Sequence, residues 1–148
     1  MNLMIPSGRP IEILLVEDSA DSAEMTMEAL RDGRVRNRIH WVKDGEEAMA
    51  FLRRENGHAA APRPDLVLLD LHLPCMNGHE VLAAIKEDAA LRRIPIVILT
   101  STENEEAILD AYELHANCCV TKPADQEQFA LAVKKIEQFW LRRVTRRS

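Results

Sequence analysis

Three short apolar runs lack the alternation of apolar and polar residues that marks a strand with one solvent-facing side. They cover residues 11–16, 66–69 and 96–99 and are rich in leucine and β-branched residues. Continuous apolar runs of this length are typical of strands that are buried on both faces, as in a parallel sheet. Residues 38–42 and 118–121 are predicted to form two further strands.

Segments with a helical period separate these strands. Each carries apolar residues along one face, and together they cover residues 20–32, 45–54, 79–87, 103–115 and about 125–143. Gly33 is a stop signal after the first helix, and Asp44 can cap the second. Five strands that alternate with five helices predict an α/β fold, in which right-handed crossovers cover both faces of a parallel sheet.

Four of the predicted strands end in a polar or charged residue. Asp70 follows the run 66–69, and a carboxylate at the tip of a buried strand is costly unless something pairs with it. The other strand ends carry Glu17 with Asp18, Thr100, and Lys122. Ligands of α/β proteins bind at the carboxyl ends of parallel strands. We therefore predict a functional site at this edge of the sheet, with Asp70 at its centre.

The residue types at these strand ends favour a metal-assisted chemistry. Three converging carboxylates would repel one another, and hard oxygen ligands with few protein contacts suit Mg²⁺. We predict that Asp18 and Asp70 bind Mg²⁺ directly and that Glu17 acts through water. With the ammonium of Lys122 and the hydroxyl of Thr100, they would enclose a tetrahedral dianion. Phosphoryl transfer needs little beyond such positioning and charge neutralisation, and a carboxylate nucleophile gives an aspartyl phosphate.

Four sequence motifs surround these strand ends. They are Glu17-Asp18-Ser19, Asp70 with Leu73-Pro74 and Met76-Asn77-Gly78, Thr100-Ser101, and Thr121-Lys122-Pro123. In order and spacing they resemble the receiver domain of two-component response regulators, and the resemblance covers about residues 10–140. It implies the flavodoxin-like receiver fold, a doubly wound five-stranded parallel sheet with strand order 2-1-3-4-5.

The resemblance also implies roles for single residues. Asp70 is then the phospho-acceptor, and Lys122 and Thr100 contact the phosphoryl oxygens. The backbone carbonyl of His72 joins Asp18 and Asp70 as a ligand of Mg²⁺. Receivers often carry an aromatic residue three positions before the lysine, where this chain has Cys119. How phosphorylation is read out is therefore left open by the sequence.

A narrower resemblance links the chain to single-domain regulators of phytochrome-type, light-sensing histidine kinases. It rests on Leu91-Arg92-Arg93-Ile94-Pro95, Leu114-His115-Ala116-Asn117-Cys118, Glu127-Gln128-Phe129 and Phe139-Trp140. Such regulators tend to be dimers, which implies a homodimer through residues 103–143. The implied partner is a sensor histidine kinase, with a bacteriophytochrome as one candidate.

Two other classes of protein share part of the pattern. A small Mg²⁺-dependent phosphohydrolase would use the same carboxylates, lysine and threonine. It normally needs a second carboxylate two residues beyond the nucleophile, where this chain has His72. A degenerate receiver that acts as a binding module is disfavoured because the whole set of site residues is present.

Composition narrows the class of protein further. The chain has 148 residues, 47% of them hydrophobic, and a formal net charge of −5, which argues against nucleic-acid binding. No apolar stretch approaches the roughly 18 residues of a membrane span, and no signal segment opens the chain. We therefore expect a cytoplasmic signalling protein rather than an enzyme. The expected parts are a leader (1–10), a receiver domain (11–143) and a basic tail (144–148), without an effector domain.

Overall fold

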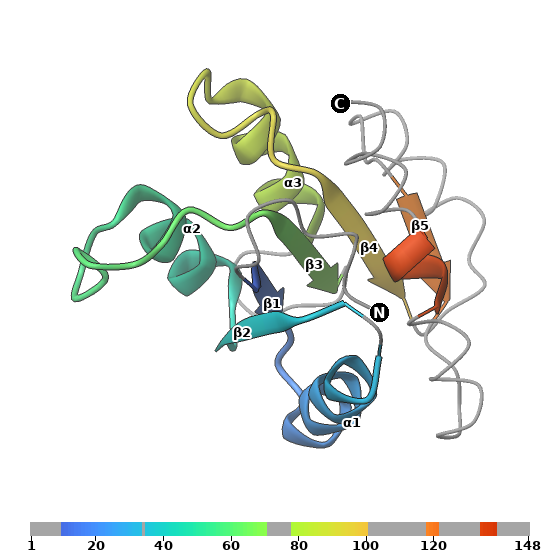
Figure 1. Cartoon of the computed structure of the whole chain (residues 1–148). Coiled ribbons are helices and arrows are strands. Elements are labelled where there is room, and N and C mark those ends of the chain that lie inside the picture. The colour runs from blue at the N-terminus through green and yellow to red at the C-terminus, as the bar shows by residue number, and fades with distance from the viewer. Residues whose placement is uncertain (1–9, 34, 71–77, 101–117, 122–133, 139–148) are drawn as a thin grey trace, which may run out of the picture.

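The computed structural model describes five parts of the chain (Figure 1). They are residues 10–33, 35–70, 78–100, 118–121 and 134–138, with the backbone alone described at Thr100 and over 118–121. In these parts no helix is long and apolar enough to cross a membrane.

A parallel sheet of five strands forms the centre of the molecule. The strands are β1 (Ile11–Val16), β2 (Asn37–Val42), β3 (Leu66–Asp70), β4 (Ile96–Thr100) and β5 (Cys118–Thr121). Their order is β2-β1-β3-β4-β5, and every neighbouring pair is parallel. This confirms the predicted doubly wound fold and its strand order. The strand limits differ from the prediction by one residue at Asn37, Asp70 and Thr100.

Three helices follow the first three strands, and all three were predicted. They are α1 (Ala20–Arg31), α2 (Gly45–Arg53) and α3 (Gly78–Glu87). Figure 1 shows α1 on one side of the sheet and α2 with α3 on the other. Residues 134–138 are helical, inside the predicted last helix. The predicted helix over 103–115 and the rest of the last helix lie outside the described residues.

Two hydrophobic cores form, one on each face of the sheet. Leu14 and Val16 of β1 pack in the core that contains α2 and α3. Ile13 and Leu15 of the same strand pack in the core that contains α1 and Ile136. These four side chains are at most 1% exposed. Burial on both faces is the reason that the strand sequences show no alternation of apolar and polar residues.

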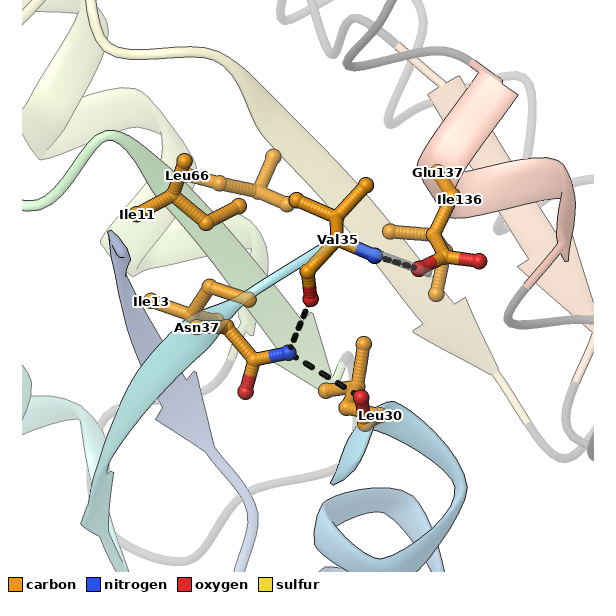
Figure 2. A pocket seen from close by; sticks show the side chains of 8 residues that line it. All are labelled: Ile11, Ile13, Leu30, Val35, Asn37, Leu66, Ile136 and Glu137. Atoms are coloured by element: carbon orange, nitrogen blue, oxygen red, sulfur yellow. Dashed lines mark hydrogen bonds between the residues drawn. The ribbon is translucent and has the colours of Figure 1, made fainter. Parts of the chain in front are cut away.

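The helical residues 134–138 are held against the corner between α1 and β2 (Figure 2). The carboxylate of Glu137 is buried, with only 8% of the residue exposed, and its Oε2 accepts a hydrogen bond of 2.7 Å from the backbone N–H of Val35. Gly33 leaves the space for this carboxylate, because a Cβ atom there would lie 2.5 Å from Oε2. This hydrogen bond thus joins two segments that are 102 residues apart in sequence.

Side-chain caps fix the starts of two helices. Ser19 accepts a hydrogen bond from the N–H of Ser22 at the start of α1. Asp44, predicted as a cap, accepts one of 2.8 Å from the N–H of Glu47 at the start of α2. Both capping residues have extended backbone conformations, as N-caps require.

We expect Asp44→Ala to lower the free energy of unfolding by about 1 kcal/mol, because the N–H of Glu47 loses its acceptor. Urea denaturation followed by circular dichroism measures this change. Asp44→Asn is the matched control, since its side-chain oxygen still accepts, and it is expected to unfold within a few tenths of a kcal/mol of wild type. An alanine variant as stable as wild type would contradict the capping role.

Candidate functional site

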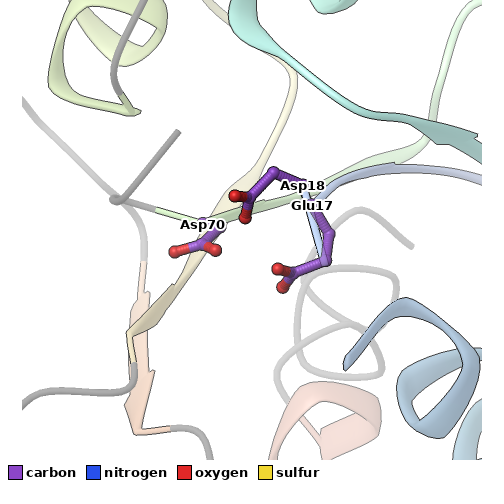
Figure 3. A group of neighbouring side chains, drawn as sticks. All are labelled: Glu17, Asp18 and Asp70. Carbon is purple, nitrogen blue, oxygen red and sulfur yellow. The ribbon is translucent and has the colours of Figure 1, made fainter. Parts of the chain in front are cut away.

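Three carboxylates meet at the C-terminal edge of the sheet (Figure 3). Glu17 and Asp18 follow β1, and Asp70 is the last residue of β3. The two strands are neighbours, and Val16 is aligned with Leu69 in their register. One oxygen from each carboxylate lies within 4.8 Å of the other two. The structure therefore brings together the three acidic residues that the sequence placed at strand ends.

The three carboxylates differ in burial. Glu17 is 0% and Asp70 is 4% exposed, whereas Asp18 is exposed to solvent. Two unit negative charges at a separation near 4.8 Å repel each other by about 3 to 4 kcal/mol at an effective dielectric constant of about 20. This repulsion, together with a donor set made only of hard oxygen atoms, fits a divalent cation.

Both polar groups of the Glu17 backbone, its N–H and its carbonyl, form hydrogen bonds with residues of β2. Its N–H donates to the carbonyl of Val42 (3.0 Å), and its carbonyl accepts from the indole N–H of Trp41 (2.7 Å). Its side-chain Oε1 accepts from the N–H of Ser19 (3.2 Å). The turn from β1 into α1, which carries two of the three carboxylates, is thus fixed to the neighbouring strand and to the N-cap of the helix.

The remaining predicted site residues are placed only in part. Asp70 is aligned with Leu99, and Thr100 with Thr121, so the backbone of Thr100 reaches the same edge as the acidic cluster. The side chain of Thr100, together with Lys122 and His72, lies outside the described residues. Their contacts with a phosphoryl group or with Mg²⁺ stay predictions.

Trp41 contacts the site and was not predicted to do so. The sequence carries a signal for it: Trp41 is next to last in a predicted strand, and Glu17 directly follows the strand that would pair with it. Indole N–H groups usually find a hydrogen-bond partner when they are buried. The strand pairing decides which acceptor is in reach, since Leu15 is aligned with Trp41.

A model of the response regulator receiver domain matches residues 13–134 of this chain. The chain belongs to the response regulator receiver family. This receiver is 43% identical over 139 residues to the response regulator Rcp1 of Synechocystis sp., and the match covers 94% of this chain and 95% of Rcp1.

Two solved structures resemble this receiver closely. One is the phosphorylated cyanobacterial phytochrome response regulator RcpA, with a TM-score of 0.84 and 48% identity over 90% of this chain and 95% of RcpA. The other is the Mn²⁺-bound form of Rcp1, with a TM-score of 0.82 and 43% identity over 89% of this chain and 95% of Rcp1. Both resemblances drawn from the motifs, to receivers in general and to phytochrome regulators in particular, are confirmed.

Proposed function

We propose that this receiver accepts a phosphoryl group from a sensor histidine kinase onto the carboxylate of Asp70. The observation that carries the proposal is the position of Asp70, which is 4% exposed at the end of a central strand, inside a cluster of three carboxylates. Membership of the receiver family supports the same role. The receiver domain in this proposal spans residues 11–143.

The proposed chemistry is a transfer between two side chains. A carboxylate oxygen of Asp70 attacks the phosphorus of a phosphohistidine, and the phosphorus–nitrogen bond breaks. The imidazole nitrogen leaves with the bonding electron pair, and an aspartyl phosphate forms. In this proposal the ammonium of Lys122 and the hydroxyl of Thr100 contact the phosphoryl oxygens. Because the acceptor is a side chain of this chain itself, the proposed role is that of a signalling protein rather than of an enzyme.

The acidic cluster is the proposed site of Mg²⁺. Asp18 and Asp70 would bind it directly, with Glu17 acting through water and the backbone carbonyl of His72 as a further ligand. When bound, the ion neutralises charge that develops on the phosphoryl oxygens. The hydrogen bond from the N–H of Ser19 to one oxygen of Glu17 supports the indirect role of that carboxylate. The structure of Rcp1 with Mn²⁺ supports a divalent ion in this family.

The signalling context of the proposal is a phytochrome pathway. It is supported by the 48% identity to RcpA, a cyanobacterial phytochrome response regulator. The proposed partners are a sensor histidine kinase, with a bacteriophytochrome as the first candidate, and a second copy of this chain through residues 103–143. Nucleic acid and membrane are not among the proposed partners, and the proposed location is the cytoplasm.

We expect wild-type protein to gain the mass of one phosphoryl group when it is incubated with Mg²⁺ and acetyl phosphate. Asp70→Asn removes the nucleophile and is expected to gain none, as measured by intact-protein mass spectrometry. Asp21→Asn is the matched control, because Asp21 is an exposed carboxylate in the first turn of α1 and is expected to leave phosphorylation intact.

Two outcomes would contradict this function. If wild type gains no phosphoryl group, the chain acts as a binding module. If it hydrolyses small phosphomonoesters with turnover, it is a phosphohydrolase.

The phytochrome context is tested by phosphotransfer from purified histidine kinases, compared at equal kinase concentration. A bacteriophytochrome is expected to transfer its phosphoryl group to this receiver faster than unrelated kinases do.

A further inference from the structure

We propose that Trp41 is a positioning residue of the acidic site, through the hydrogen bond from its indole N–H to the backbone carbonyl of Glu17. The inference rests on the proposed metal site and adds a residue that the family motifs do not contain. The bond is 2.7 Å long, at the short end of the range for N–H···O bonds. It joins the edge strand β2 to the turn that carries two of the three carboxylates.

The peptide bond between Glu17 and Asp18 is the unit that Trp41 holds. The carbonyl oxygen of Glu17 lies in one rigid plane with the backbone nitrogen and Cα atom of Asp18. A donor that fixes the direction of this oxygen therefore fixes the point from which the Asp18 side chain starts. The N–H of Glu17, which donates to Val42, restrains the preceding peptide in the same way.

Asp18 needs such a restraint more than the other two carboxylates do. Glu17 and Asp70 are 0% and 4% exposed, so the surrounding core limits where their side chains lie. Asp18 is exposed to solvent and lacks this limit. Groups that orient a metal ligand without contacting the metal strongly affect the affinity of the site for that metal. Trp41 is therefore placed to set the affinity of the cluster for a divalent ion.

The indole ring is itself held in place on β2. Trp41 is half-buried and packs beside the core that contains α1, while the ammonium of Lys43 lies 5.4 Å from the centre of its ring. The strand pairing that aligns Trp41 with Leu15 sets the reach of the side chain toward Glu17. Phenylalanine at this position would keep most of the ring packing and remove only the N–H donor.

The test compares the Mn²⁺ affinity of wild type and Trp41→Phe by titration calorimetry. We expect the Kd of the variant to rise about tenfold, in the range found for groups that orient metal ligands. One control separates this from a general loss of stability. Asp44→Ala removes a helix cap next to the same strand, with an expected loss of stability of about 1 kcal/mol. It is expected to keep the wild-type Kd.

Intrinsic fluorescence gives a second measurement of the same contact. In a Trp140→Phe background, Trp41 is the sole tryptophan, and Mn²⁺ is expected to change its emission with a midpoint equal to the calorimetric Kd. An unchanged Kd in Trp41→Phe contradicts the positioning role while the metal site stands. Absence of Mn²⁺ binding by wild type contradicts the metal site, and this role of Trp41 falls with it.

Discussion

Replacing Asp70 with asparagine is expected to raise the melting temperature of the metal-free protein and to abolish its stabilisation by Mg²⁺. Three carboxylates have oxygens within 4.8 Å of one another, and two of these side chains are buried. Removing the charge of Asp70 relieves its repulsion with the other two carboxylates, while the asparagine amide can still hydrogen-bond to other partners of this residue. With the dielectric screening of a partly buried site, we expect a gain of about 1 to 3 kcal/mol in the free energy of unfolding.

Mg²⁺ should reverse the order of stability. An ion that binds only the folded state stabilises it by about 2.7 kcal/mol at 100 times its Kd and by about 4.1 kcal/mol at 1,000 times its Kd. The wild type is expected to show this increase, and Asp70→Asn to show none, because the variant has lost a charged oxygen ligand. The effect of the substitution on stability would then have opposite signs in the absence of the ion and at an Mg²⁺ concentration several hundred times the Kd of the wild type.

Thermal unfolding in EDTA and in MgCl₂, at matched ionic strength, measures both effects. A change of 1 to 3 kcal/mol corresponds to roughly 3 to 9 °C in a protein of this size. Asp21→Asn removes an exposed carboxylate from the first turn of α1 and serves as the control, with an unchanged response to Mg²⁺. If metal-free Asp70→Asn protein melts below wild type, repulsion among the three carboxylates does not limit the stability of the metal-free fold.

The apolar pattern predicts the sheet because its central strands are buried on both faces. Leu66 to Leu69 are each 0% exposed, and they were predicted as a strand from their continuous apolar run alone. The start of β2 was missed by one residue, at Asn37. Its side-chain amide donates to the carbonyls of Leu30 and Val35, at 3.0 and 2.9 Å, and these contacts have no signal in a hydrophobic pattern.

The acidic cluster was within reach of sequence reasoning because parallel strands bring their C-terminal ends to one edge of the sheet. The same reasoning does not tell which carboxylate is buried. Glu17 and Asp18 are neighbours in sequence, yet one is 0% exposed and the other is exposed. The difference depends on packing and on the hydrogen bonds with Trp41 and Val42, which require the register of β2 against β1.

Gly33 was predicted to follow the first helix, but the reason inferred for a glycine at this position was wrong. It was interpreted as a stop signal directly after a helix that ends at residue 32, but α1 ends at Arg31, with Asp32 as its C-cap. The backbone φ of Gly33 is not positive, so the residue does not need the conformational freedom of glycine. Among the described glycines, Gly57 is the one with a positive φ. The structural reason for glycine is the carboxylate of Glu137, which occupies the place of a side chain. A contact across 102 residues leaves no local pattern.

We expect Gly33→Ala and Glu137→Ala each to lower the free energy of unfolding. We also expect the double variant to lose less stability than the sum of the two single losses. Glu137→Ala leaves the N–H of Val35 buried without this acceptor, at a cost of about 1 to 3 kcal/mol. Gly33→Ala places a Cβ atom 2.5 Å from Oε2 of Glu137, and overpacking of this kind costs about 1 to 3 kcal/mol.

The double variant distinguishes a direct contact from two separate effects. Once Glu137 is alanine, the new Cβ at position 33 meets no carboxylate, and the backbone at Gly33 suits an ordinary residue. The second substitution should then cost nothing or stabilise slightly, because alanine restricts the unfolded chain more than glycine does. Urea denaturation of the four proteins is expected to give a coupling energy of about 1 to 3 kcal/mol.

Two controls define the origin of this coupling. Gln138→Ala alters an exposed neighbour in the same helical segment and is expected to change stability by less than about 0.5 kcal/mol. Glu137→Gln keeps an oxygen that accepts from Val35, so it should retain most of the stability if the hydrogen bond matters more than the charge. Additive effects of Gly33→Ala and Glu137→Ala would contradict the contact. Val35 precedes β2, whereas Glu17, Asp18 and Asp70 lie where β1 and β3 end. Strong coupling would therefore mean that the helical residues 134–138 are bound at the end of the sheet opposite the acidic cluster.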